Sequence, residues 1–340
     1  MSEIRRTRPP SMADVGRHAS VSAQTVSRYF TGGYLSTETR RRVEAAIAQL
    51  GYRRNRLPSS LRRNRTDTIG YLSVGPLNYG ASGILTGLSR AAVGAGQSLI
   101  TSQLDLDPED PDAGAKVQHA MDTFLSLRVD GIISGSPYLG LEALVEFVAD
   151  DVPVVALTER LGDLVDSVRA DSYGAGRLAV EHLAALGHRR ILHVAGPAST
   201  IEGTERERGY VETMAAHGLL PMPVVNAGTW TARGGADAAQ RVDAADFTAV
   251  FAGNDPIALG FVSAMRGRGV TCPGDYSIVG VDDMPEVEFY HPPLTSVRID
   301  FETMGEKAFE MLMGRIETGD RTRHTVLETE LVVRASTAAA

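Results

Sequence analysis

The stretch that decides the fold of the N-terminal part is Met12–Phe30, MADVGRHASVSAQTVSRYF. Apolar residues recur at helical spacing over 12–19, which predicts a short amphipathic helix. Ser20 begins a turn, and Ser22 is a good N-cap for a second helix over 22–30. Two short helices joined by a turn of three or four residues are typical of a helix-turn-helix, whose second helix enters the major groove of DNA.

The second predicted helix presents side chains that suit base recognition. Val21 and Val26 are expected to face the first helix, which leaves Gln24 and Arg28 pointing outward. Gln pairs with adenine and Arg with guanine through bidentate hydrogen bonds. We therefore expect the DNA contacts of this helix to come from Ser22, Ala23, Gln24, Thr25, Ser27 and Arg28.

A third helix is predicted after the Gly32-Gly33 loop, because apolar residues recur at helical spacing from Val43 to Leu50. Ser36 and Thr39, at its N-terminal end, offer hydroxyl groups that suit phosphate contacts. The alternative is a three-helix domain that binds another protein and has a solvated, charged outer face.

Charge separates the N-terminal part from the rest of the chain. Residues 1–66 contain 14 arginines and four acidic residues, a formal net charge of +10, whereas the whole chain of 340 residues carries −8. The remainder is therefore strongly acidic. This asymmetry indicates that the N-terminal part alone meets a polyanion, and it disfavours the protein-binding alternative.

From residue 67 onward, short β-rich runs alternate with helical ones. Strands are predicted at 68–74, 98–104, 131–134, 152–157, 190–195, 249–252 and 277–281. The predicted helices between them include 82–95, 173–186, 203–217 and 255–268. Apolar strands joined by amphipathic helices indicate parallel sheets covered on both faces, and this length favours two doubly wound lobes with a ligand cleft between them.

Composition and motifs exclude several classes of protein. The single cysteine, Cys272, leaves no internal disulfide framework or all-cysteine metal site. Apolar runs are too short to span a membrane and the N-terminus has no secretory signal, so we expect a cytoplasmic protein without a membrane partner.

An enzyme is likewise disfavoured. The sequence has no Gly-x-Ser-x-Gly elbow, no Walker loop and no zinc spacing, and Gly174-Ala-Gly176 lacks the third glycine of a dinucleotide fingerprint. His182, His188 and His193 fall on no common helical face. We therefore expect no catalytic residues, metal or cofactor.

Several motifs resemble the LacI/GalR family of transcription regulators. In the N-terminal part these are VSAQTVSR (21–28), LSTETR (35–40), VEAA (43–46) and LGY (50–52), followed by NRLPSSLR (55–62). In the body they are EHLAALGH (181–188), VAGP (194–197), RERGY (206–210), GNDPIALG (253–260), SIVGVDD (277–283) and PPLTSVR (292–298). Each motif is weak alone, but their order along the chain makes the resemblance specific.

The resemblance implies a domain organisation. A helix-turn-helix headpiece would span 1–54, a hinge helix and linker 55–66, and an effector-binding and dimerisation body 67–340. In the hinge helix, which would begin near Asn55, Leu61 matches the residue that wedges into the minor groove. The body would have the fold of periplasmic sugar-binding proteins. Its N-lobe would comprise about 67–168 and 298–326, and its C-lobe about 169–297 and 327–340.

The resemblance also implies an effector site in the cleft. In the C-lobe, the matching positions are Arg206, Trp230, Asn254, Asp255 and Asp282, with Phe301 as a second apolar wall. In the N-lobe, Thr158 and Ser134 stand where lactose-type repressors have an aspartate and an asparagine. Asn78 and Tyr79, after the first body strand, are expected to add polar and stacking contacts. These departures favour a glucoside or short oligosaccharide over a plain galactoside.

Two departures in the headpiece bear on DNA binding. Ser20 stands where the family usually has glycine, and a left-handed backbone costs about 1 kcal/mol for other residues. Ala23 is small where relatives often carry a larger side chain that contacts bases. The operator sequences of those relatives therefore do not predict the operator of this chain.

The resulting hypothesis is a repressor that binds pseudo-palindromic, double-stranded operator DNA as a homodimer and is released by a sugar or glycoside. The tail over 334–340 lacks an apolar heptad, so we expect a dimer. The alternatives are control by a different small ligand or by a protein corepressor, and, less favoured, a cytoplasmic sugar-binding protein or an enzyme.

Overall fold

The computed structural model describes residues 8–53, 65–106, 111–136, 138, 151–158, 165–320 and 324–340. The chain divides into two compact units, Met1–Thr66 and Asp67–Ala340. Asn55 and Leu61, which are assigned to the hinge helix above, lie outside the described residues.

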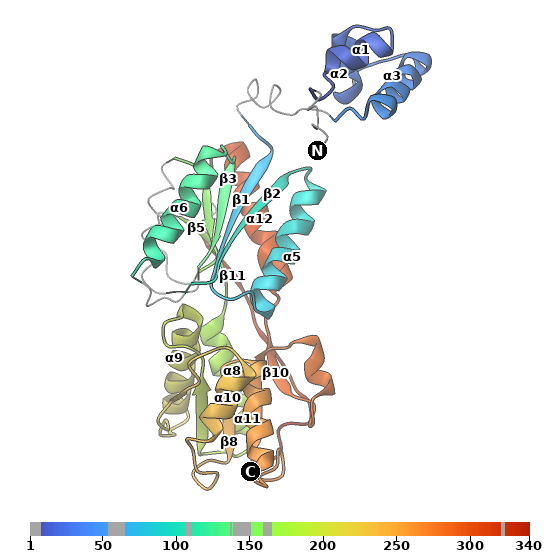
Figure 1. Cartoon of the computed structure of the whole chain (residues 1–340). Helices are drawn as coiled ribbons and strands as arrows, with labels where there is room; N and C mark the ends of the chain where they lie inside the picture. The colour runs from blue at the N-terminus through green and yellow to red at the C-terminus, as the bar shows by residue number, and fades with distance from the viewer. Residues whose placement is uncertain are drawn as a thin grey trace, which may run out of the picture. The chain divides into compact units, whose positions relative to one another are not determined.

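Over residues 8–53 the first unit has three helices (Figure 1): α1 (Met12–His18), α2 (Ala23–Phe30) and α3 (Thr37–Leu50). Each helix begins after a serine whose side-chain oxygen accepts a backbone N–H from the third helical residue; these serines are Ser11, Ser22 and Ser36. The helices expected from the sequence are thereby confirmed.

A small apolar core holds these helices together. Its buried members are Val15, Ala19, Val26, Val43, Ala46 and Tyr52. Between α1 and α2, Ser20 has a φ of +55°, so it adopts the left-handed conformation for which glycine is better suited. The turn therefore forms as predicted, with a strained residue at its centre.

In the described part of the chain, the second unit contains two six-stranded sheets. The first has the order β11-β5-β4-β3-β1-β2 and is parallel throughout. Its strands are β1 (Thr68–Val74), β2 (Ser98–Leu104), β3 (Gly131–Gly135), β4 (Val154–Ala156), β5 (Asp166–Ala170) and β11 (His324–Leu327).

The second sheet has the order β12-β10-β9-β8-β6-β7 and is parallel except for β12. Its strands are β6 (Ile191–Ala195), β7 (Val225–Asn226), β8 (Ala249–Ala252), β9 (Ser277–Asp282), β10 (Thr295–Arg298) and β12 (Glu330–Val332). Two doubly wound lobes were predicted, and the sheets confirm them.

Helices cover both faces of each sheet (Figure 1). On the first sheet, α5 (Tyr79–Gly94) and α12 (Phe301–Thr318) pack on one face and α6 (Ala113–Ser126) on the other. On the second, α8 (Ser172–Ala185) and α9 (Ile201–Ala216) oppose α10 (Ala232–Ala239) and α11 (Asp255–Gly267). A short 3-10 helix, η1 (Pro285–Phe289), follows β9.

The chain passes between the two lobes three times: after β5, after β10 and after β11. Strand β5 extends to Ala170, two residues beyond the expected limit of the N-lobe at 168, and Arg298 still belongs to the second sheet. These crossings place the strand ends of both sheets around one cavity.

Helices α8 and α9 pack at unusually close range. A Cβ atom on Gly176 would lie 2.4 Å from the carbonyl oxygen of Arg206, and one on Gly209 would lie 2.3 Å from that of Tyr173. Gly176 therefore serves helix packing, whereas a Cβ on Gly174 would meet the Asp171 side chain that caps α8. The close packing of the two helices fixes the position of α9, which carries Arg206.

Candidate functional site

The outer face of α2 carries the side chains predicted to read DNA. Val26 is fully buried beneath it. Ser22, Ala23, Gln24 and Arg28 are exposed on it, and Thr25 and Ser27 are half-buried. The hydroxyl oxygens of Ser22 and Thr25 lie 2.9 Å apart, so both help to hold the start of the helix. Gln24 and Arg28 are thus the long polar side chains on this face.

The start of α3 presents a second polar surface. Ser36 donates a hydrogen bond of 2.9 Å to the Thr39 hydroxyl and accepts the backbone N–H of the same residue at 3.2 Å. Arg41 follows Thr39 closely in the sequence, and its side chain is 80% exposed. Tyr34, in the preceding loop, is 93% exposed and is not among the residues predicted to contact DNA.

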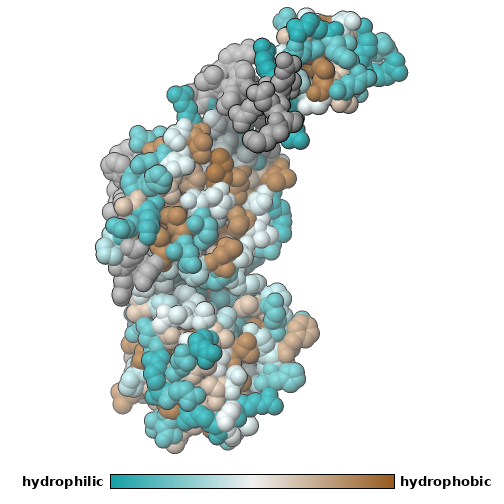
Figure 2. All heavy atoms as spheres, viewed as in Figure 1, coloured by the Kyte–Doolittle hydropathy of each residue, from teal (hydrophilic) through white to brown (hydrophobic). Residues whose placement is uncertain are grey.

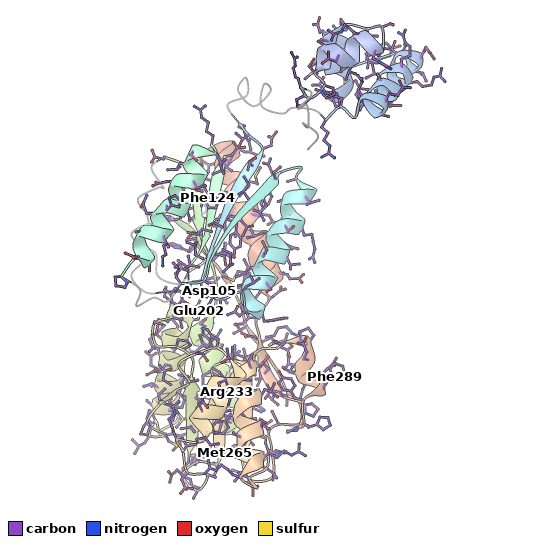
Figure 3. All side chains as sticks on the ribbon, in the orientation of Figure 1. Asp105, Phe124, Glu202, Arg233, Met265 and Phe289 are labelled. Carbon is purple, nitrogen blue, oxygen red and sulfur yellow. The ribbon has the colours of Figure 1, made fainter. Side chains whose placement is uncertain are left out.

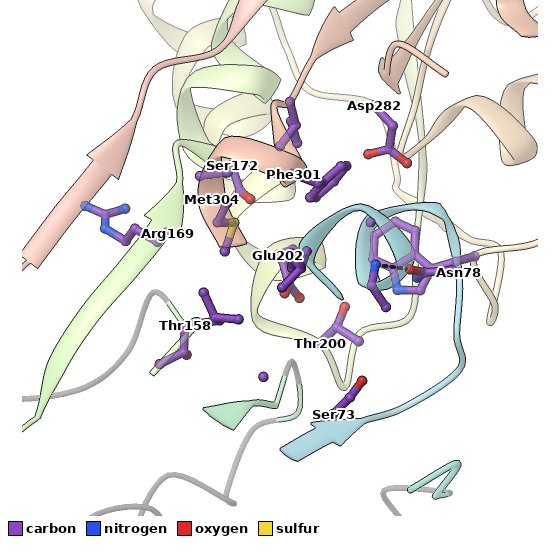
Figure 4. Close-up of a pocket in the computed structure, with 18 of the residues that line it drawn as sticks. Ser73, Asn78, Thr158, Arg169, Ser172, Thr200, Glu202, Asp282, Phe301 and Met304 are labelled. Carbon is purple, nitrogen blue, oxygen red and sulfur yellow. Dashed lines mark hydrogen bonds between the residues drawn. The ribbon is translucent and has the colours of Figure 1, made fainter. Parts of the chain in front are cut away.

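A pocket between the two lobes of the body collects most of the predicted effector residues (Figure 4). Seven of them line it: Asn78, Thr158, Arg206, Trp230, Asn254, Asp282 and Phe301. They come from both lobes and from the crossing segments, so a molecule bound here contacts parts of the chain that are distant in the sequence.

Arg206 and Asp282 form the charged centre of the C-lobe wall. Their side chains are 6% and 10% exposed, and Arg206 Nη2 lies 3.8 Å from Asp282 Oδ1. Arg206 Nη1 donates a 2.6 Å hydrogen bond to the carbonyl oxygen of Gly253. The guanidinium carbon lies 5.2 Å from the Trp230 ring centroid, a cation–π distance.

Asp282 occupies a strained and desolvated position at the end of β9. Its φ is +106°, a region that non-glycine residues rarely adopt and that is found at functional sites. Burial raises the pKa of Asp282 to about 6, although the neighbouring Arg206 lowers it. The carboxyl group is thus poised to change its ionisation near neutral pH.

The position of Trp230 is fixed by its surroundings. Asn254, the N-cap of α11, accepts the Ile257 N–H at 2.9 Å and donates to the Trp230 carbonyl oxygen at 3.2 Å. A Cβ on Gly196 would lie 2.2 Å from the Trp230 ring, so the ring packs directly on this glycine. An aromatic face is thereby held next to the Arg206–Asp282 pair.

Three predicted effector residues, Asp255, Tyr79 and Ser134, are not among the residues that line this pocket. Asp255 is fully buried, where its carboxylate accepts the Ser296 hydroxyl at 2.5 Å and the Met284 N–H at 2.9 Å. Burial and nearby Asp282 hold the pKa of Asp255 well above its usual value. Asp255 therefore links the start of α11 to β10 and to the segment that follows β9, on the side away from the pocket.

Local geometry keeps the other two, Tyr79 and Ser134, out of the lining. Tyr79 is the first residue of α5, which begins three residues earlier than expected, and its ring packs edge-on against Phe301 at 5.9 Å. Ser134 is buried within β3, and the next residue, Gly135, lines the pocket instead. Because side chains alternate along a strand, an error of one residue selects the wrong face.

Sequence reasoning missed several polar residues of the lining: Ser73, Tyr138, Arg169, Ser172, Thr200 and Glu202. Ser73 and Arg169 lie next to the last residues of β1 and β5. The general rule that ligands bind at the carboxyl ends of parallel strands would have found these two.

The histidines of the second lobe have structural partners. His188 lies 3.0 Å from the hydroxyl oxygens of both Thr248 and Ser277. His193 lies fully buried, with Nδ1 2.9 Å from the Phe251 carbonyl oxygen, and burial lowers its pKa to about 4. Across the described residues, no cluster of three His, Cys, Asp or Glu side chains is placed to hold a metal ion.

None of the helices that the structure describes is both long enough and apolar enough to cross a bilayer.

Comparison with known families matches two parts of the chain. Residues 11–55 match the family described as bacterial regulatory proteins, lacI family. Residues 180–337 match the periplasmic binding protein-like domain. The two matches correspond to the three-helix unit and to most of the second lobe with its returning segments.

Relatives extend over nearly the whole chain. The lactose operon repressor of Escherichia coli (strain K12) is 30% identical over 98% of this chain and 92% of its own length. The HTH-type transcriptional regulator CelR of Thermobifida fusca is 34% identical over 98% of this chain and 100% of its own.

Solved structures agree with these relatives. A lac repressor dimer bound to operator and the anti-inducer ONPF has a TM-score of 0.86 at 29% identity, covering 98% of this chain and 100% of that one. A CelR–cellobiose complex has a TM-score of 0.70 at 31% identity, covering 96% and 99%. Fold and site define a ligand-regulated, DNA-binding transcription regulator. The chain belongs to the lacI family of bacterial regulatory proteins.

Proposed function

We propose that this chain is a transcriptional repressor whose operator affinity is controlled allosterically by a sugar or glycoside in the pocket between the lobes. The observation that carries the proposal is the Arg206–Asp282 pair, buried beside Trp230. A guanidinium donates hydrogen bonds to the hydroxyl oxygens of a sugar, and a carboxylate accepts hydrogen bonds from its hydroxyl groups. An aromatic face covers the apolar side of the sugar ring.

The DNA contacts are assigned to the headpiece. Gln24 and Arg28 read base edges from α2, and Ser36 and Thr39 contact phosphates at the start of α3. Asn55 and Leu61, which lie outside the described residues, are proposed to contact the DNA at the centre of the operator. The exposure of Gln24 and Arg28 in the structure supports the first of these roles.

A homodimer presents two headpieces to the two half-sites of a pseudo-palindromic operator. The similarity to the lac repressor dimer bound to operator supports this assembly. Exposed apolar residues are available for a contact between copies. On the second lobe, Phe289 is 72% exposed and Leu259 is 39% exposed. On the first lobe, Val93 is 75% exposed, and Figure 2 shows further apolar residues gathered on that lobe.

The sugar differs from a plain galactoside, because Thr158 lines the pocket where lactose-type repressors have an aspartate. A glucoside or short oligosaccharide is proposed instead, and the similarity to the CelR–cellobiose complex supports this choice. The protein has two lobe arrangements, and one of them is competent to bind DNA. The sugar shifts the protein away from that arrangement only by as much as its affinity for the other arrangement is higher.

The proposal is tested by operator binding in the presence of sugars. Asp282→Ala should remove the response to the sugar and leave operator affinity within about threefold of the original. Asp237→Ala, an exposed aspartate on α10, is the matched control and should respond normally. An Asp282→Ala protein that still releases operator on addition of the sugar would place the effector site elsewhere.

A further inference from the structure

The adjacent residues Asp282 and Asp283, at the end of β9, have different partners. Asp282 lines the pocket (Figure 4), whereas Asp283 is not among the lining residues. The Asp283 side chain is 4% exposed, and its two carboxylate oxygens contact two guanidinium groups. Arg298 Nε donates to Oδ2 at 2.8 Å, and Arg334 Nη1 lies 2.7 Å from Oδ1. Asp283 is therefore a buried anion that holds two arginines next to a residue of the pocket.

Arg298 stands where the chain leaves the second lobe. It is the last residue of β10, and the chain crosses to the first lobe directly after it. Its Nη1 donates a 3.4 Å hydrogen bond to Glu330 Oε2. Glu330 is the first residue of β12, where the chain has just returned from the first lobe. One guanidinium group thus joins Asp283 to two of the three crossing segments.

The register of the strands places these residues side by side. Asp282 on β9 is opposite Arg298 on β10, and Arg298 is opposite Glu330 on β12. This row runs across three strands, from the pocket wall to the crossing segments. A twist of the crossing segments therefore reaches Asp282 as long as the contacts of this row hold.

The backbone at the end of β9 is strained. The φ angles of Asp282 and Asp283 are +106° and +51°, both in the left-handed region that favours glycine. Such a conformation persists only where the surrounding contacts determine it. The Asp283 N–H donates a 3.1 Å hydrogen bond to Ser296 Oγ on β10, in addition to the two ion pairs of its carboxylate. The contacts of Asp283 therefore hold the turn that brings Asp282 into the pocket wall.

The contact between Arg298 and Glu330 is the weakest of the network. It is the longest, at 3.4 Å, and the two side chains are 49% and 74% exposed, so water competes with it. The contacts of Asp283 are shorter and more buried. The network can therefore release the segment that enters β12 while it keeps the segment that leaves β10.

We propose that Asp283 is a positioning residue that couples the pocket to the movement of the lobes, by holding Arg298 and, through it, Glu330. This inference rests on the proposed function, and it adds the residues that transmit the effect of the ligand. Without the charge of Asp283, the crossing segments twist independently of Asp282. A ligand that contacts Asp282 then no longer selects one lobe arrangement.

The first test measures the lobe arrangement of the full chain without a ligand. Spin labels on Asp122→Cys in α6 and Asp237→Cys in α10, both at exposed positions, report the distance between the lobes by double electron–electron resonance, and Cys272→Ser removes the native thiol. An excess of unlabelled chain excludes distances between copies. Asp283→Asn and Arg298→Gln should each broaden the distance distribution to roughly twice its width. Arg298→Lys keeps the charge and should retain the narrow distribution.

The second test measures the coupling, with cellobiose as the probe. The coupling factor is the operator dissociation constant at saturating cellobiose divided by the operator dissociation constant without cellobiose. Asp283→Asn should lower this factor about fivefold, because cellobiose still binds but no longer moves the lobes. Saturation of each protein removes any difference in cellobiose affinity from the comparison.

Asp166→Asn is the matched control. The Asp166 side chain is 2% exposed and is also paired with an arginine, Arg315, at 3.3 Å. However, Asp166 is the first residue of β5, and the chain crosses between the lobes after the other end of that strand. Both asparagine variants should lower the Tm, because each breaks a buried ion pair. Only Asp283→Asn should change the distance distribution and the coupling factor.

An Asp283→Asn protein that matches Asp166→Asn in both measurements would overturn the inference and leave Asp283 a purely structural residue. A different result concerns the proposed function. If cellobiose does not change the operator affinity of the unsubstituted chain, cellobiose is excluded as its effector, and the distance distribution alone decides the role of Asp283.

Discussion

Arg206 and Asp282 face each other across 3.8 Å in the wall of the interlobe pocket, and both side chains are at least nine-tenths buried. Arg206 comes from α9 and Asp282 from the end of β9, so their contact depends on the packing of a helix against a sheet. Burial of a charged pair is costly unless further hydrogen bonds satisfy it. Here the Nε of Arg206 makes no hydrogen bond within the described residues, which leaves a donor for a ligand.

This relationship predicts a pH dependence of stability. The pKa of Asp282 is about 6 in the fold, against an ordinary value of 3.8. Because the folded pKa is the higher one, the protonated carboxyl stabilises the fold, and that contribution is present below about pH 4 and lost as the pH rises through 6. Asp282→Asn imitates the protonated state and removes this titration.

Urea unfolding at pH 5 and pH 7.5 measures the effect. At each pH, the unfolding free energy of the original protein is subtracted from that of the Asp282→Asn protein. This difference should be larger at pH 7.5 than at pH 5 by roughly 1 kcal/mol. Asp237→Asn, on the exposed face of α10, should show no such difference. An Asp282→Asn protein with the same pH profile as the original would show that Asp282 titrates normally.

Arg28 is predicted to determine operator specificity. Arg28→Ala should weaken binding to the specific operator by about 1–3 kcal/mol and binding to random DNA far less, because a base-reading guanidinium contributes mainly at the correct sequence. Fluorescence anisotropy at one fixed salt concentration measures both affinities. Arg233→Ala, an exposed arginine of α10, is the control for loss of charge. Equal losses of affinity for the specific operator and for random DNA would show that Arg28 contacts phosphates and does not read bases.

Ser20 is predicted to strain the headpiece turn. Its φ of +55° suits glycine, so Ser20→Gly should stabilise the headpiece by up to about 1 kcal/mol. Gly51→Ala should do the reverse, because Gly51 ends α3 with a φ of +60°. Amide hydrogen exchange of α1 and α2 in the full chain reports both. Slower exchange in Gly51→Ala than in Ser20→Gly would contradict this explanation.

Phe289 is predicted to lie at the contact between two copies of the chain. It is 72% exposed at the end of η1 and is labelled in Figure 3 at the edge of the second lobe. Phe289→Glu should raise the dimer dissociation constant at least tenfold in analytical ultracentrifugation, because it places a charge in an apolar contact. Leu220→Glu, at a position 87% exposed, should leave it unchanged. If Leu220→Glu raised the dimer dissociation constant and Phe289→Glu did not, the contact would lie at Leu220 and not at Phe289.

Much of the fold was predictable because the apolar runs are short and regular. The predicted strands 68–74, 98–104 and 249–252 have the same bounds as β1, β2 and β8. Strand β5, which contains Arg169 and a buried Asp166, was missed because charged residues interrupt its apolar pattern. Its aspartate is paired with Arg315 from α12, a contact that no local pattern reveals.

The site was less predictable than the fold, and Asn254 and Asp255 illustrate the reason. Both residues are polar and both stand at the start of α11, yet Asn254 lines the pocket and Asp255 turns inward to Ser296. Ser296 lies 41 residues further along the chain. Which of two adjacent side chains faces a ligand depends on such tertiary partners. Ser172 was missed for a related reason, because no local pattern marks it as a residue of the pocket wall.

Control of DNA binding by a sugar in the pocket can be measured through the fluorescence of Trp230. Trp230 is the only tryptophan in the chain and it lines the pocket, so its emission reports on that site. Titration with the effective sugar should give a saturable change. Saturating operator DNA should then weaken the apparent sugar affinity by the same factor by which the sugar weakens operator affinity. A sugar affinity that operator DNA leaves unchanged would show that the sugar in the pocket does not control DNA binding.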